Sequence, residues 1–167
     1  LVDDVLYAHD TGVGLVVVKG GSAALAQGGG ALRDVRVTAI TGGGPGFLLI
    51  GTQDRGLLRF DLAKGRFARL GEFGDGIAAS EILSVSRLAN EDIAVGTLRN
   101  GLHVLDRDGR PLLRMDRDHG LPDNAVLALK TVTGSLWAGT SGGVAQLLLP
   151  GSVEAFSAGE GLPGIVE

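Results

Sequence analysis

The 167-residue sequence has no cysteine, few aromatic residues and no cluster of basic residues. Without cysteine the chain has neither a disulfide framework nor thiolate chemistry, and its redox environment stays open. One Trp, one Tyr and five Phe against 29 Gly suit short strands joined by tight turns better than helices. The 15 Lys and Arg are scattered along a chain of net charge −4, which excludes the basic footprint of a nucleic-acid binder.

Long apolar runs are missing as well. The longest runs, at 15–18 and 147–149, are strand-length, whereas a membrane-spanning helix needs about 20 residues. The sequence therefore predicts a chain that is not embedded in a membrane. Residues 1–4 lack an initiator Met and the basic-then-apolar layout of a signal peptide, which favours a piece of a longer protein.

An internal repeat of 42 to 45 residues runs through the chain. An apolar run, a Gly-Thr pair and a following Gly before another apolar residue occur at 48–57 and 93–102, and again at 136–144. Segment 6–15 keeps the spacing but loses the Gly-Thr pair, which makes it a degenerate fourth copy. Two sets of glycines mark the period independently: Gly51, Gly96 and Gly139, and Gly21, Gly65, Gly109 and Gly151.

Each repeat predicts four short strands. In the clearest copy they cover 125–130, 135–140, 143–149 and 152–156, with Gly in the turns between them. The first strand of earlier copies is expected at 35–41 and 82–88. Because strand-length apolar runs and Gly turns leave no helical spacing, a helical solenoid is the weaker alternative.

The sequence thus predicts an all-β fold, a β-propeller of about four four-stranded antiparallel blades. The blades are expected at about 1–30 together with 161–167, then at 31–72, 78–115 and 121–157. The first copy begins at its second strand, and 161–166 repeats the Gly-Leu-Pro of 120–122. These two partial blades are either one blade that closes a four-bladed ring or the ends of a sector of a larger ring, which we favour.

One copy carries a family resemblance. Gly120-Leu121-Pro122, followed by Gly134-Ser135-Leu136-Trp137-Ala138-Gly139-Thr140, resembles the two-component regulator propeller repeat. The pattern weakens in the other copies, although the spacing continues through essentially the whole chain. The resemblance implies a periplasmic or extracellular sensor propeller of a two-component signalling protein, which binds a small molecule, a glycan or a protein partner ahead of a membrane helix and an output domain.

Two other function classes stay open. One is a structural propeller fragment that completes itself by homo-oligomerisation, and the other is a propeller lyase or hydrolase. The three histidines, His9, His103 and His119, fall at different phases of the repeat, and no Ser lies in a nucleophile-elbow sequence. We therefore predict no catalytic residues, no metal and no cofactor.

The candidate ligand surface is the rim where loops entering first strands meet the turns between second and third strands. Arg55 and Arg99 occupy matching positions before the Gly of their repeats, so together they would hold a carboxylate or a sugar acid. The alternative is that both are ordinary solvent-facing turn residues. The predicted ligand-binding residues are Asp54, Arg55, Arg99, Asn100, Asp118 and His119, with Asp10 on the same surface.

Three further features have structural interpretations. Trp137, at an alternating apolar position, is expected to pack between blades. The Gly-Thr pairs are expected to let strands approach and to tie down the next turn. Segment 116–124 gathers oxygen ligands of the kind calcium accepts, but its spacing follows no calcium loop, so we expect a solvated loop with local Asp and Asn hydrogen bonds.

Overall fold

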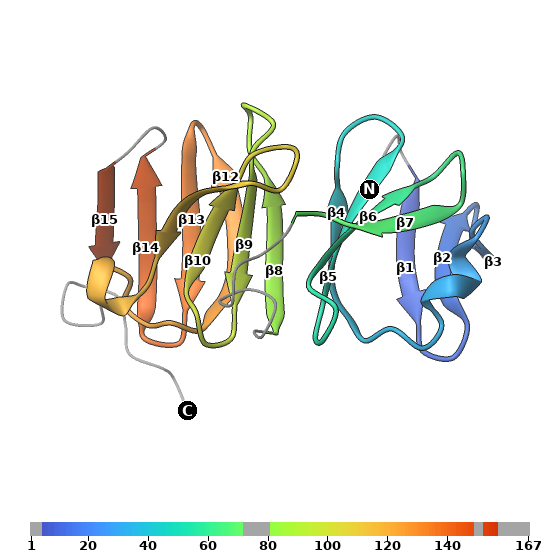
Figure 1. Ribbon diagram of the computed structural model, residues 1–167, viewed down its shortest axis with the longest axis horizontal. Helices are drawn as coiled ribbons and strands as arrows, with labels where there is room; N and C mark the ends of the chain where they lie inside the picture. Colours follow the sequence, from blue (N-terminus) through green and yellow to red (C-terminus); the bar gives the residue numbers. More distant parts are fainter. Residues whose placement is uncertain (1–4, 72–80, 149–151, 157–167) are drawn as a thin grey trace.

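The computed structural model describes residues 5–71 and 81–148, together with the backbone of 152–156. These residues form an all-β chain of four antiparallel sheets that follow one another along the sequence (Figure 1). Sheet A contains β1 (Leu6–Asp10), β2 (Gly14–Lys19) and β3 (Ser22–Leu25). Sheet B contains β4 (Val37–Gly42), β5 (Phe47–Thr52), β6 (Leu57–Asp61) and β7 (Arg66–Arg69). Sheet C contains β8 (Ile82–Arg87), β9 (Ile93–Thr97), β10 (Leu102–Leu105) and β11 (Pro111–Met115). Sheet D contains β12 (Val126–Val132), β13 (Ser135–Thr140), β14 (Gly143–Leu148) and β15 (Ser152–Phe156).

Each sheet is a meander, because strands that are consecutive in the sequence pair side by side. The four strands predicted for the last repeat agree with β12 to β15 to within two residues. The first strands predicted at 35–41 and 82–88 correspond to β4 and β8. Short 3-10 helices, η1 (Gly29–Leu32) and η2 (Arg117–His119), precede β4 and β12. None of the helices in the described ranges is long and apolar enough to cross a membrane.

Sheet A has three strands among the described residues, whereas the other sheets have four. Its β1 forms a hairpin with β2 in the way that β5, β9 and β13 pair with the strands that follow them. This agrees with the expectation that the first repeat begins at its second strand. Residues 161–167, predicted to supply a first strand, and Gly151 lie outside the described residues, so ring closure stays a prediction.

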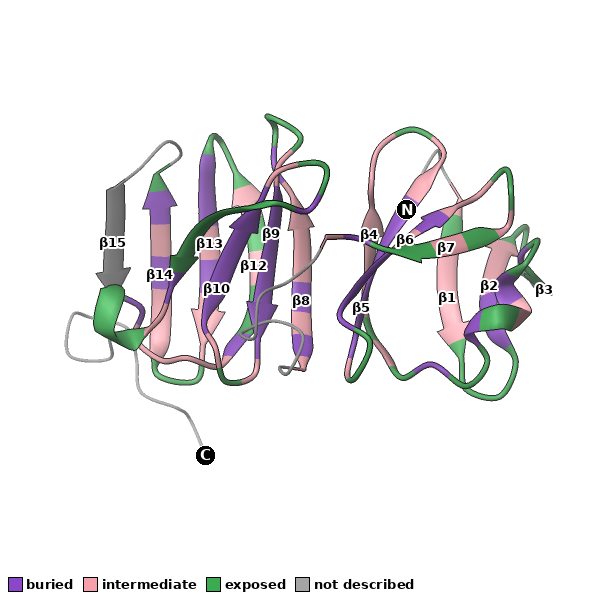
Figure 2. Cartoon of the chain, in the orientation of Figure 1, coloured by how far each residue is buried: buried purple, intermediate pink, exposed green. Residues whose placement is uncertain are grey.

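The sheets stack through their apolar faces. The first strands β4, β8 and β12 lie next to one another, with β8 between the other two. Because side chains alternate between the faces of a strand, sheets B and C each contribute residues to two interfaces, whereas sheets A and D contribute to one each. Figure 2 shows β9 and β10 buried along their length. The principal core residues are Leu15, Leu48 and Phe60 between sheets A and B, Leu49, Ile82 and Val95 between B and C, and Ala94, Leu102 and Leu136 between C and D.

Two glycines of the Gly-Thr pairs allow close contact between sheets. A methyl group at Gly51 would lie 2.6 Å from Ile82 Cγ2, in the first strand of the next sheet. A methyl group at Gly96 would lie 2.8 Å from the carbonyl oxygen of Val126, again in the next first strand. Since close-packed interiors have no room for an added carbon at such distances, the structural interpretation of these two glycines is confirmed.

The threonines of the pairs tie down the turns that follow them. Thr52 Oγ1 donates to the Gly56 carbonyl at 2.6 Å and accepts from the Arg55 amide at 3.0 Å. Thr97 makes the same two bonds in the β9–β10 turn, both at 2.9 Å. The hydroxyl role expected from the sequence is therefore confirmed.

Glycines also bring main chains together at the outer edge of the sheets. A Cβ atom on Gly28 would lie 1.8 Å from the Gly65 carbonyl oxygen, and one on Gly71 would lie 2.3 Å from the Gly109 carbonyl oxygen. In both pairs the segment that leaves one sheet contacts the outer turn of the next sheet. Gly28 and Gly71 have φ values of 69° and 79°, so a side chain there would also meet backbone strain.

Candidate functional site

Two kinds of loop meet at one end of the sheets: the loops that enter first strands and the turns between second and third strands. The Gln53 amide in the β5–β6 turn donates to the carbonyl of Arg36, which lies just before β4, at 3.0 Å. The Gly101 amide in the β9–β10 turn donates to the Asn124 carbonyl at 3.0 Å, which links sheet C to the loop entering sheet D. We call this surface, made of residues 53–56, 98–101 and 116–125, the rim.

The six predicted ligand-binding residues lie on the rim. Asn100 is half-buried, and the other five are exposed: Asp54 and Arg55 in the β5–β6 turn, Arg99 in the β9–β10 turn, and Asp118 and His119 in η2. Asp10 is exposed at the end of β1. Within the part of the chain that the structure describes, the side chains of Arg55 and Arg99 form no hydrogen bond or ion pair. Their shared hold on a carboxylate stays a prediction.

The oxygen-rich loop of the rim uses its oxygens locally. Asp116 Oδ1 accepts from His119 Nδ1 at 2.5 Å, and Asn124 Oδ1 accepts from the Arg117 amide at 2.7 Å. Asp123 Oδ1 accepts a backbone amide two residues later at 2.8 Å. The hydrogen bond from His119 is the main cause that holds the pKa of Asp116 below its usual value. These are the local Asp and Asn bonds expected from the sequence.

His103 of β10 supports the rim from inside. Its side chain is 6% exposed, and its Nε2 donates to the Asn100 carbonyl at 3.1 Å. Burial, followed by the nearby Arg114 guanidinium, lowers the pKa of His103 from 6.5 to about 4. The ring is therefore neutral at pH 7, and it fastens the β9–β10 turn to its strand.

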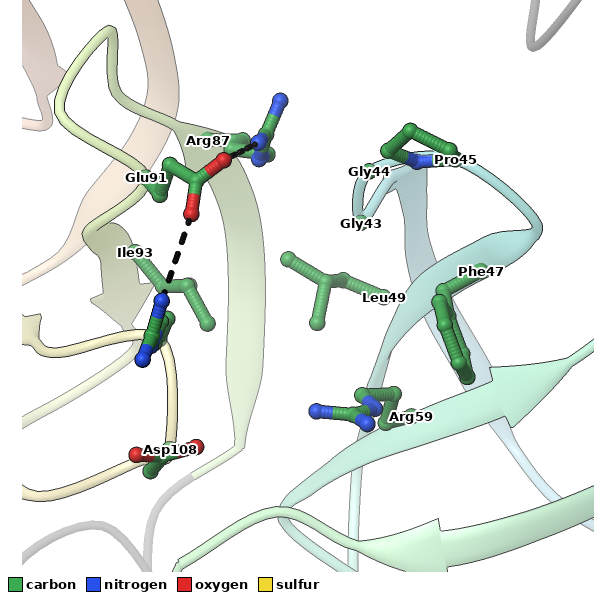
Figure 3. A pocket seen from close by; sticks show the side chains of 11 residues that line it. Gly43, Gly44, Pro45, Phe47, Leu49, Arg59, Arg87, Glu91, Ile93 and Asp108 are labelled. Atoms are coloured by element: carbon green, nitrogen blue, oxygen red, sulfur yellow. Dashed lines mark hydrogen bonds and ion pairs between the residues drawn. The ribbon is translucent and has the colours of Figure 1, made fainter.

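The opposite end of sheets B and C holds a cavity of about 340 Å³ (Figure 3). Leu49 of β5 and Ile93 of β9 face each other across it from the two sheets, and Phe47 flanks it. Three guanidinium groups line the space: those of Arg59 in β6, Arg87 in β8 and Arg107 in the β10–β11 turn. Volumes of this size are typical of small-molecule sites, which span roughly 300–1,000 Å³.

The three arginines differ in their partners. Glu91 of the β8–β9 turn bridges two of them, with Oε1 2.9 Å from Arg87 Nη2 and Oε2 3.9 Å from Arg107 Nη1. Arg59 lies over the Phe47 ring, 4.4 Å from its centroid. Within the described ranges Arg59 has no acidic partner, so its guanidinium is available to an anion.

A second hollow of about 380 Å³ adjoins the first and shares Phe47 and Arg59 with it. Among the described residues, six basic side chains line the two hollows, against three acidic ones. The six are Arg59, Lys64, Arg66, Arg69, Arg87 and Arg107, and the three are Asp61, Glu91 and Asp108. This surface, which we call the basic end, is cationic in a chain whose net charge is −4.

The residues of this cavity are absent from the predicted ligand-binding set. A signal exists in β6, where Arg59 interrupts the apolar run of Leu57, Leu58 and Phe60. The equivalent positions are Val104 in β10 and Gln146 in β14, because each pairs with the corresponding residue of the preceding strand. An arginine at a position that is apolar or neutral in sister repeats marks a local departure from the scaffold.

Neither the protein-family models nor the curated proteins give a match to this sequence. Among solved structures, the extracellular domain of the putative hybrid two component system BT3049 from B. thetaiotaomicron matches 98% of this chain, with a TM-score of 0.78 and 16% identity, over 23% of its own length. This chain shares the fold of that domain. The extracellular domain of BT4673, a second putative hybrid two component system of B. thetaiotaomicron, matches 90% of the chain, with a TM-score of 0.66 and 21% identity, over 21% of its length.

A designed protein has a similar fold. The computationally designed Ika8 protein matches 93% of the chain, with a TM-score of 0.68 and 16% identity, over 47% of its length. The chain spans about a fifth to a quarter of the two natural domains that it matches. The resemblance noted in the sequence is thus supported at the level of the fold.

Proposed function

We propose that this chain is a sector of a β-propeller and belongs to the extracytoplasmic sensing part of a two-component signalling protein. The likeness of 98% of the chain to part of the extracellular domain of a putative hybrid two component system carries this proposal. The stacking of β4, β8 and β12 supports the propeller, because blades pack face to face around an axis lined by their inner strands.

In this proposal the sheets act as a rigid frame that presents loops at both ends. Gly51 packs closely against the Ile82 side chain, and Gly96 packs closely against the main chain of Val126, so neighbouring sheets are in tight contact. A ligand that bridges loops of two sheets would therefore favour one arrangement of the whole frame, and the shift would reach a neighbouring domain as a rigid-body movement.

Sensing is tested in the source bacterium by an in-frame deletion of this segment and by the double substitution Arg55→Ala/Arg99→Ala. Transcripts are compared with the parent strain across growth substrates, and protein level is followed by immunoblot. We expect both strains to lose induction of one gene set on one substrate, with the double variant present at the parental level. Lys19→Ala, an exposed substitution at the end of β2 away from the rim, is the control. Identical transcripts in the deletion strain and the parent on every substrate would contradict a sensing role.

A second candidate, assembly with further sheets, is favoured by the outer face of sheet D. Trp137 and Gly139 on this face match Ala94 and Gly96 of sheet C, which sheet D covers. In sheet D the nearest neighbour of a methyl group at Gly139 would be Ala128 Cβ, at 3.7 Å. Trp137 is half-buried here, so its packing between blades stays a prediction.

Light scattering of the chain over a wide concentration range tests assembly. We expect a mass that rises with concentration, and a Trp137→Ser variant that stays monomeric. A cooperative monomer at every concentration would remove assembly through this face and favour the closed ring. Leu112→Ser, an exposed leucine on β11, is the matched control and should associate as the parent does.

A further inference from the structure

We propose that the cavity between sheets B and C binds a small carboxylate attached to an apolar or ring-shaped body. This site is separate from the rim, and the proposal rests on the proposed sensing function only for its biological role. The site itself is defined by Arg59, Arg87 and Arg107, the Phe47 ring, and the facing Leu49 and Ile93 side chains.

The first argument is the local excess of positive charge. The cavity brings together three guanidinium groups and the side chains of Glu91 and Asp108. The described residues that line the hollow beside it add three basic side chains, Lys64, Arg66 and Arg69, and one acidic side chain, Asp61. An anion that approaches this end of an acidic chain therefore meets a favourable field, which raises its local concentration.

The second argument is that the chain already places a carboxylate between two of these arginines. One oxygen of the Glu91 carboxylate accepts a hydrogen bond from Arg87 at 2.9 Å, and the other lies 3.9 Å from Arg107 Nη1. The two guanidinium groups are thus spaced to hold one carboxylate between them. Glu91 has a φ of 72°, a left-handed conformation that is unfavourable for a residue with a side chain. An acidic residue at a position suited to glycine is explained by its hold on the two arginines.

The third argument is the state of Arg59. Its guanidinium stacks on Phe47 and points toward the space in front of Leu49 (Figure 3). Arginine presents a planar fork of donors that matches the two oxygens of a carboxylate. The side chain is half-buried, so a charge pair formed there is less screened than one on the open surface.

The apolar walls decide what the carboxylate is attached to. Leu49 and Ile93 face each other from adjacent sheets, and Phe47 closes one side. Inorganic anions would leave these surfaces in contact with water, whereas an apolar body would cover them and gain about 25 cal/mol for each Å² removed from water. The shape therefore favours an organic carboxylate over a bare anion.

The test is calorimetric titration of the 167-residue chain with benzoate, with its neutral amide, benzamide, and with inorganic sulfate. We expect saturable benzoate binding at millimolar concentrations or below, and at least tenfold weaker binding of the other two. Arg59→Ala should weaken benzoate binding at least tenfold, and Arg59→Lys should weaken it less, because the charge remains while the fork is lost. Arg33→Ala, an exposed arginine outside the cavity and outside the predicted ligand-binding set, is the matched control and should bind as the parent does.

Glu91→Gln gives a test in the opposite direction. It removes the internal carboxylate and releases two guanidinium groups, so benzoate affinity should rise several-fold. Circular dichroism establishes that each variant is folded. Equal binding of benzoate and benzamide, no saturable binding of benzoate, or equal losses in Arg59→Ala and Arg33→Ala would each overturn the proposal. Benzoate binding without any transcript response would contradict the sensing role but not the site. A transcript response without benzoate binding would contradict the site but not the sensing role.

Discussion

Substitution of Gly96 by alanine tests the idea that glycines set the distance between sheets. The added methyl group would lie 2.3 Å from Ser84 Oγ and 2.8 Å from the Val126 carbonyl oxygen. These two atoms are themselves joined by a hydrogen bond of 3.1 Å, in which Ser84 donates across the interface between sheets C and D. The methyl group would have to displace the hydroxyl and push β12 outward.

The expected cost follows from three contributions. Overpacking of a close-packed interface destabilises by about 1–3 kcal/mol. Loss of the Ser84 hydrogen bond adds about 0.5–1.5 kcal/mol. Replacement of glycine by alanine also restricts the unfolded chain, which offsets the loss of stability by about 0.4–1 kcal/mol. The net expectation is a loss of about 0.5–4 kcal/mol, which for a chain of this size lowers the unfolding temperature by roughly 1–16 °C.

The measurement is thermal unfolding followed by far-ultraviolet circular dichroism, at a concentration where light scattering gives the monomer mass. Gly139→Ala is the matched control, since its methyl group would meet Ala128 Cβ at 3.7 Å, an ordinary contact. Its unfolding temperature should stay within experimental error of the parent. Gly51→Ala should fall between the two, because its closest contact is the Ile82 side chain rather than main chain. The reasoning is refuted if Gly96→Ala unfolds at the parental temperature.

Two further predictions concern buried polar groups. His103→Gln should flatten the pH dependence of stability. The folded chain holds the pKa of His103 at about 4, so between pH 6.5 and 4 only the unfolded chain takes up the proton. In the parent, the free energy of unfolding should therefore decrease by about 1–3 kcal/mol, after solvent screening, as the pH is lowered through this range. Urea denaturation at a series of pH values measures it, and equal slopes in the two proteins would contradict it. Thr97→Val should cost about 1–3 kcal/mol, since it removes both turn bonds, one of which holds the half-buried Asn100 amide. Thr140→Val, which loses one bond of 2.8 Å at a half-buried position, should cost less, and equal urea midpoints would argue against this account.

The sheets could be predicted from the sequence because their signals are local. A turn needs glycine within a few residues of the strands that it joins, so the spacing of Gly65 and Gly109 marks outer turns directly. The role of Thr52 is equally local, because its hydroxyl bonds within its own turn. The ends of the strands can be predicted only to within one or two residues, because the alternation of apolar and polar side chains does not specify where the pairing of two strands ends.

The cavity could not be predicted in the same way, because it forms between two sheets. Arg59 and Glu91 are 32 residues apart in the sequence and approach only after sheets B and C stack. Periodicity shows which residues share a face, but not which side chains of the next sheet lie opposite them. The candidate residues of the rim were found because their turns repeat, whereas Arg59 differs from its counterparts Val104 and Gln146.

The outer faces of sheets A and D are different surfaces, and this restricts the symmetry of any self-association. The outer face of sheet D carries Gly139, at the position where sheets B and C receive the next first strand. The outer face of sheet A carries Leu6 and Leu25, which are 46% and 54% exposed. A twofold dimer would place two copies of one face together, and the described part of the chain supplies no first strand to fill the space above Gly139 in that arrangement. Contact between unlike faces repeats head to tail, so association continues until the subunits close into a ring or grow into a filament.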